Sequence, residues 1–182
     1  MNTFIRTLSF ALCSALLLAA CGPSDEDKQK AAEAAAQAAA NAPVPLPAPG
    51  ADDAAWQKYL VSVVTRNMQG VKTNHPFMYY VPAGDTQAAQ DARKSQLDNV
   101  GTTVARGVLP GNMLAFGGPD SKATADLIVT AFAGSADKSM PGANDGSFKD
   151  VVVLFAGASA DQQRVRDALA KSGAELRFVE MK

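Results

Sequence analysis

Three short runs of apolar residues and one alternating run predict the strands of a β-sheet. A run that is apolar at every position is typical of a parallel strand with both faces covered. The alternating run, which comes last in the chain, indicates an edge strand with one wet face. The four runs are 77–81, 113–116, 151–155 and 174–179.

Before and between these runs, apolar residues recur every three or four positions, which predicts four helices. Asp52 or Asp53 is the expected N-cap of the first helix, and Asp85 or Thr86 that of the second. Ser159, in the turn before the last helix, is expected to cap that helix by accepting a backbone N–H. The four helices span about 52–70, 86–107, 124–132 and 160–171.

Strands that alternate with helices imply right-handed crossovers, which lay the helices on the sheet. We therefore expect an α/β fold, a small layered domain with a mostly parallel sheet of about four strands and about four helices. Pro76 and Pro82 flank the first strand. They favour an edge position for it, because proline cannot donate a hydrogen bond to a neighbouring strand.

The first twenty residues have the pattern of a signal segment rather than of a folded element. Arg6 is their only charge, and an apolar run of thirteen residues extends from Leu8 to Ala20. A membrane-spanning helix needs about 20 such residues. The run therefore predicts a secretory signal that is removed from the mature protein.

The apolar run closes on Leu18-Ala19-Ala20-Cys21, which resembles the lipobox of bacterial lipoproteins. The resemblance covers only the first twenty-odd residues. It implies cleavage before Cys21 and acylation of the cysteine, with palmitate among its acyl chains. Gly22 rather than aspartate comes next, which resembles the outer-membrane sorting class of Gram-negative lipoproteins. The resemblance thus implies a lipid anchor in the inner leaflet of the outer membrane and a domain in the periplasm.

The mature chain then divides into two parts. Residues 21–50 begin with charged residues, continue with an alanine-rich run and end with proline at every second position, which predicts a lipidated tether. Residues 51–182 are expected to form one globular domain. Loss of Arg6 leaves 16 basic and 18 acidic residues. That balance gives no basic surface for nucleic acid or anionic headgroups. The lipid on Cys21 is therefore the expected attachment to the membrane.

Cys21 is also the only cysteine kept after cleavage, because Cys13 lies in the signal segment. The mature domain is therefore expected to contain no disulfide, no thiolate metal site and no cysteine nucleophile. The single histidine, His75, lacks partners for a zinc site, and the loop around Asn144 lacks the side-chain oxygens of an EF-hand. We expect no metal and no cofactor.

The turn that contains Gly117, Gly118 and Ser121 is one candidate site. Its backbone N–H groups precede a helix and could bind an anion. It lacks the spacing of a nucleotide-binding loop. An ordinary turn, in which Asp120 or Ser121 caps the helix, explains the same residues.

A second candidate is Ser159, which follows a strand as the nucleophile of an α/β-hydrolase elbow does. Asp161 stands where that pattern needs glycine, and His75 precedes the serine rather than following it. Gln162, three residues after Ser159, instead completes a capping box. We favour the cap and assign no catalytic residue.

The loop from Gly134 to Phe148 is a third candidate, because loops of this length in compact domains are usually functional or mobile. Met140 and Phe148 are the apolar side chains that it offers to a partner.

Two functional hypotheses follow. The first is a non-enzymatic, lipid-anchored module that binds an envelope or secreted protein, as a secretion or envelope-assembly accessory or as an immunity-type inhibitor. The second is a small periplasmic hydrolase or ligand-binding domain that uses the turns around Ser121 and Ser159, since open α/β sheets bind ligands at the carboxyl ends of their strands. The second hypothesis requires both serines and the 134–148 loop to meet at one pocket.

Overall fold

The computed structural model describes residues 30, 42–134 and 142–182. The chain divides into two compact units, Met1–Ala40 and Asn41–Lys182, and the fold described below is that of the second unit. The signal segment, the lipidation site at Cys21 and the candidate contact residue Met140 lie outside the described residues.

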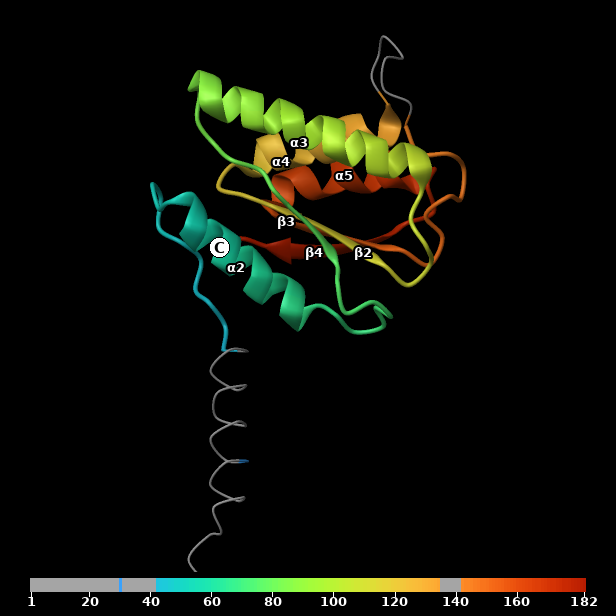
Figure 1. Cartoon of the computed structure of the whole chain (residues 1–182), viewed down its shortest axis with the longest axis horizontal. Helices are drawn as coiled ribbons and strands as arrows, with labels where there is room; N and C mark the ends of the chain where they lie inside the picture. Colours follow the sequence, from blue (N-terminus) through green and yellow to red (C-terminus); the bar gives the residue numbers. More distant parts are fainter. Residues whose placement is uncertain (1–29, 31–41, 135–141) are drawn as a thin grey trace, which may run out of the picture. The chain divides into compact units, whose positions relative to one another are not determined.

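Four parallel strands form the sheet of this unit, in the order β1-β2-β3-β4 (Figure 1). The predicted α/β fold is therefore confirmed. The first and last strands are the edges, as the flanking prolines and the alternating pattern predict. The strands are β1 (Phe77–Tyr80), β2 (Met113–Gly117), β3 (Val152–Gly157) and β4 (Glu175–Glu180).

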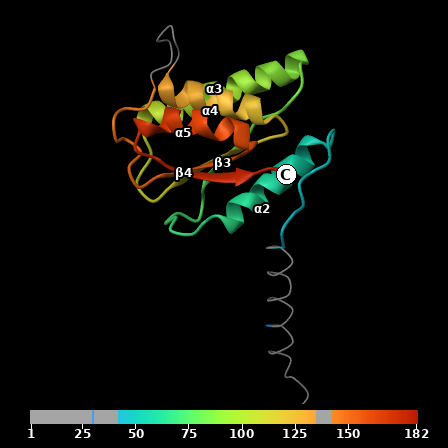
Figure 2. The same cartoon turned by 180° about the vertical axis from the view of Figure 1, so that it is seen from behind.

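Helices cover both faces of the sheet, three on one side and one on the other (Figures 1 and 2). The three crossovers between neighbouring strands all step in the same direction, so their right-handedness places their helices on one face. These are α3 (Gln87–Arg106), α4 (Ser121–Ala133) and α5 (Ser159–Ala170). The opposite face is covered by α2 (Asp53–Arg66), which precedes the first strand.

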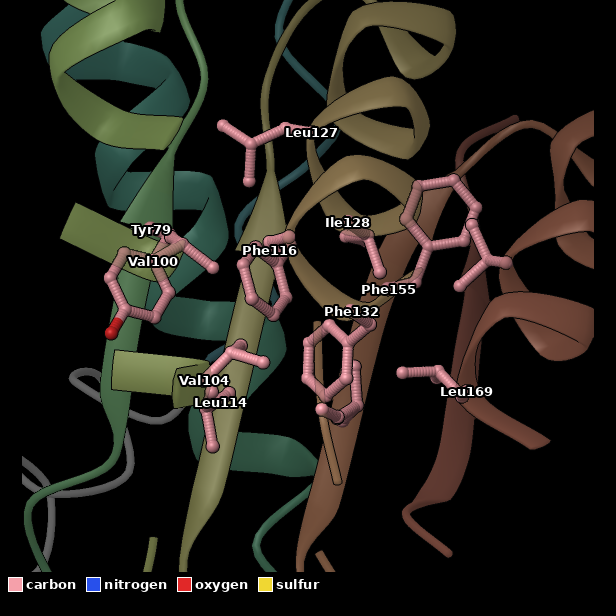
Figure 3. Packing of buried hydrophobic residues seen from close by; sticks show 14 of the residues in the cluster. Tyr79, Val100, Val104, Leu114, Phe116, Leu127, Ile128, Phe132, Phe155 and Leu169 are labelled. Atoms are coloured by element: carbon pink, nitrogen blue, oxygen red, sulfur yellow. The ribbon is translucent and has the colours of Figure 1, made fainter. Parts of the chain in front are cut away.

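Each face of the sheet carries its own core. On the three-helix face, alternate strand residues such as Phe116 and Phe155 pack against Val100, Ile128 and Leu169 of the helices (Figure 3). On the other face, the intervening strand residues, among them Met113 and Leu154, pack against α2. The continuous apolar runs of β2 and β3 follow from this double covering.

The proline-rich segment at 42–50, which we call the proline strap, packs on the α2 side of the domain. Val44 donates its backbone N–H to Ser62 Oγ at 3.1 Å. Val44 and Leu46 also contact the core beneath α2. This last part of the expected tether therefore lies on the folded domain rather than leading freely to it.

The expectation of one wet face on β4 is wrong. Arg177, on the face that the alternation predicts to be wet, extends over the end of α2 and donates to the carbonyls of Asn67 and Gln69. Val179, on the same face, contacts the α2-side core. The alternation marks an edge strand, but α2 reaches far enough to cover both residues.

Candidate functional site

Gly117, Gly118, Ser121 and Ser159 all lie at the carboxyl ends of the central strands. The first two residues end β2 and begin its turn, and the serines are the first residues of α4 and α5. Phe148 lies at the opposite edge of the sheet, where its N–H donates to the carbonyl of Ser172 beyond the end of α5. The glycines and serines of the predicted candidate sites are therefore close together, whereas Phe148 is not near them.

The two glycines lie in close contact with neighbouring elements. A Cβ on Gly117 would lie 2.9 Å from Leu60 Cδ1 of α2. A Cβ on Gly118 would lie 1.9 Å from the carbonyl oxygen of Val81, just after β1. Gly118 therefore needs to be glycine for close packing, whether or not an anion binds nearby, whereas the atom closest to Gly117 is the end of a side chain that can move.

The amino end of α4 is satisfied from within the chain. Asp120 Oδ1 accepts the N–H of Ala123 at 3.0 Å, which confirms Asp120 as the cap. The carboxylate stands where a bound anion would have to be, and its negative charge opposes one. The ordinary-turn interpretation accordingly describes Gly117, Gly118 and Ser121 better than the anion-site interpretation.

Ser121 caps the neighbouring helix instead of its own. Its Oγ accepts the N–H of Ala158 at 2.7 Å and donates to Asp161 Oδ2 at 2.5 Å. The N-cap residue of α5 is Ala158, whose side chain makes no capping bond. The prediction that Ser159 caps α5 is therefore wrong, and the hydroxyl that closes this helix end comes from a residue 37 positions earlier.

Arg164 extends this network across the two helices. It donates to Asp161 Oδ1 at 3.0 Å, to Asp126 of α4 and to the carbonyl of Lys122. Partial burial acts to raise the pKa of Asp126, but the bonds and charges of Arg164 and Lys122 outweigh it and lower that pKa. Because the pKa of Asp126 is lowered in the folded protein, the interaction of its carboxylate with Arg164 and Lys122 stabilises the fold at pH values above the ordinary pKa of 3.8. This stabilisation is lost as the pH falls through the lowered pKa. Because the Asp126 side chain is 48% exposed, solvent keeps the effect small.

Replacing Ser121 by alanine is expected to lower the free energy of unfolding by about 1–2 kcal/mol, since the N–H of Ala158 loses its acceptor and Asp161 a donor. Ser159→Ala, the matched control, should change it by no more than about 0.5 kcal/mol because Ser159 makes no capping bond. Urea unfolding monitored by the fluorescence of Trp56, the only tryptophan, measures both. Equal losses in the two variants would contradict the assigned network.

The described end of the 134–148 loop is part of the core. Phe148 is fully buried and its ring lies 5.0 Å from that of Phe132 in an edge contact. Ala143 and Gly146 donate to carbonyls at the carboxyl ends of α4 and α5. Phe148 thus stabilises the fold and is not exposed to a partner.

The described residues do not bring a serine and a histidine together as a serine hydrolase requires. His75 precedes β1 and is exposed at the amino edge of the sheet, whereas Ser121 and Ser159 lie at the carboxyl edge. In the described ranges, no three residues of the types His, Cys, Asp or Glu are grouped so as to hold a metal ion. No helix within these ranges is both long enough and apolar enough to cross a membrane.

A surface that the sequence analysis missed runs between α2 and the edge strand β1. Two adjoining cavities of about 210 and 380 Å³ share Val61 and Met78 as lining residues. Val61 is 47% exposed and Met78 46%. We call this surface the β1 groove; its other lining residues are Gln57, Leu60, Val64, Thr65, Met68, Asn74, Pro76 and Tyr80.

The β1 groove combines apolar side chains with an open sheet edge. The only strand paired with β1 in the described sheet is β2, so the opposite side of β1 faces no strand. Phe77, 41% exposed, points to the sheet face opposite to that of Met78. The edge therefore offers apolar contacts on both faces to any chain that lies along it.

No protein-family model, curated protein or solved structure matches the chain.

Proposed function

We propose that this chain is a lipid-anchored protein of the bacterial envelope whose α/β domain binds another protein through the β1 groove. The anchor rests on the sequence Leu18-Ala19-Ala20-Cys21 and the signal-like segment before it. Gly22 favours the outer membrane, with the domain on the periplasmic side. The observation that carries the binding role is the exposure of Val61 and Met78 along an unpaired sheet edge.

The geometry favours an extended apolar segment of the partner. A segment that pairs with β1 gains main-chain hydrogen bonds from the open edge. Its side chains alternate between the two faces, so one set enters the groove beside Met78 while the other lies near Phe77. An exposed apolar groove is costly unless something covers it, which also supports a partner.

Photo-crosslinking in intact cells tests this proposal. A photoreactive amino acid at Val61 is expected to form a crosslink to one protein, identified by mass spectrometry. The same amino acid at Ala170, an exposed position of α5 on the three-helix side, is the matched control and should form none. Met78→Asp should abolish the crosslink at position 61, because a carboxylate in the groove would lose its hydration when the partner binds.

Unchanged Trp56 fluorescence in Met78→Asp verifies that the domain is still folded. A crosslink that forms equally from positions 61 and 170, or that survives Met78→Asp, would contradict binding through the β1 groove.

A further inference from the structure

A second cavity, distinct from the β1 groove, opens at the carboxyl edge of the sheet. Its volume is about 470 Å³, within the range of roughly 300–1,000 Å³ typical of small-molecule sites. Its apolar walls come from segments far apart in the sequence, and these are Leu46, Pro47 and Pro49 of the proline strap, Trp56 of α2, Pro119 after β2 and Met181 after β4.

The topology explains why a cavity forms here. In most open α/β sheets the ligand crevice lies where the strand order reverses and helices leave on opposite faces. This sheet has no such reversal, because its order is β1-β2-β3-β4. The turns to α4 and α5 lie on one side of the edge, and the proline strap with the start of α2 lies on the other. The strap thus replaces the missing half of the crevice.

The polar groups at the cavity indicate what kind of ligand it suits. Ser121 and Ala158 contribute to the lining, but Ser121 Oγ already bonds to Ala158 and Asp161. Trp56 is different: its residue is 6% exposed, and its indole Nε1–H is buried without a hydrogen-bond partner among the described residues. A buried donor without an acceptor costs free energy. Because Nε1 is shielded from solvent, the indole must turn its N–H toward the cavity for the acceptor of a ligand to recover that cost.

Charge at the edge disfavours an anion. Asp120 caps α4 and Asp161 lies in the first turn of α5. The helix ends that attract anions in other α/β proteins therefore already carry carboxylates. The cavity consequently suits a ligand without negative charge.

From the cavity, its apolar walls and the unpartnered indole, we propose that this edge is a binding site for an uncharged, mainly apolar small molecule that carries a hydrogen-bond acceptor. Trp56 and the prolines of the strap hold its apolar body, and the acceptor is directed to the Trp56 wall. The strap that forms this wall continues toward the predicted anchor at Cys21, so the site lies on the segment that links domain and membrane.

The probe for this site is N-methylbenzamide, a neutral ring with an amide carbonyl, titrated into the ¹⁵N-labelled full-length chain. Because Trp56 is the only tryptophan, its indole N–H gives a single assignable signal. We expect a saturable shift of that signal with half-saturation at ~1 mM, as is ordinary for so small a ligand. Benzoate, the anionic counterpart, should produce no saturable shift at the same concentrations.

Ala158→Phe fills the cavity and should abolish the shift, whereas Ala170→Phe on the exposed side of α5 should leave it unchanged. Nuclear Overhauser effects in the unmodified protein give an answer that does not depend on either variant folding, and they should join the ring protons of the probe to Trp56 and Met181. No saturable shift with N-methylbenzamide, equal binding of benzoate, or contacts to other residues only would overturn the proposal.

Discussion

Replacing Phe116 by alanine is expected to lower the free energy of unfolding by about 3–5 kcal/mol. Phe116 lies in the central strand β2 and is fully buried. Its ring stacks on that of Tyr79 at 5.0 Å between centroids and lies at the centre of the three-helix core (Figure 3). Removing the ring leaves a cavity inside the packed core, which cannot close without moving neighbouring elements.

Phe77→Ala, at the edge of the same sheet, is the matched control. Phe77 is 41% exposed, so the same truncation removes less buried surface and should cost about 1 kcal/mol or less. Urea unfolding of both variants, followed by Trp56 fluorescence, measures the two losses. Similar losses would contradict the placement of Phe116 in the core and of Phe77 at the edge.

Gly118→Ala is expected to lower the free energy of unfolding by about 3 kcal/mol, although it adds only one methyl group. The new Cβ would lie 1.9 Å from Val81 O and 2.9 Å from Val81 C. These are backbone atoms, so no side-chain rotation relieves the overlap. The Val81 segment must move away, which also strains the bond from Val81 N–H to Gly117 O, 3.0 Å long in the native fold.

Gly84→Ala separates this packing effect from the ordinary cost of replacing a glycine. Gly84 has φ +95° and open space where a Cβ would lie, so only backbone strain of about 1–2 kcal/mol is expected there. Urea unfolding of both variants measures the difference. A loss at Gly118 no larger than that at Gly84 would show that the turns after β1 and β2 do not pack as closely as described.

The fold was predictable because its signals are local. The apolar runs and helical spacing identify the four strands and four helices that the structure describes between residues 42 and 182. Asp52, Thr86 and Gly107 mark helix ends where the structure has them. The parallel sheet followed from the apolarity of β2 and β3, which only a double covering explains.

Other features depend on contacts between distant residues and could not be predicted. Ser121 caps α5 across 37 positions, whereas Ser159 has the local capping pattern and does not use it. Arg177 of β4 meets α2 more than 100 positions away. The proline strap looks like a free linker in sequence, and only its contacts with Ser62 and the core show that it is held.

The candidate sites, like the fold, were predictable only where the signal in the sequence is local. Glycines and serines in strand-to-helix turns drew attention to Gly117, Gly118, Ser121 and Ser159, yet packing and capping account for the two glycines and Ser121. The β1 groove had a signal that the sequence analysis did not use. Val61 is an apolar residue on the helix face opposite to the buried Val63, and such a residue indicates a surface contact when an edge strand lies beside it.

Membrane fractionation of cells that produce Cys21→Ser tests the proposed attachment of the domain through lipid on Cys21. The unaltered protein is expected in the membrane fraction, and its mature N-terminal peptide should show the mass of an acylated cysteine. Cys21→Ser should appear in the soluble fraction with the Trp56 fluorescence of the folded domain, because the 16 basic and 18 acidic residues that follow the proposed signal segment give it no net positive charge to hold it on a membrane. A Cys21→Ser protein that remains firmly in the membrane fraction would contradict attachment through this lipid.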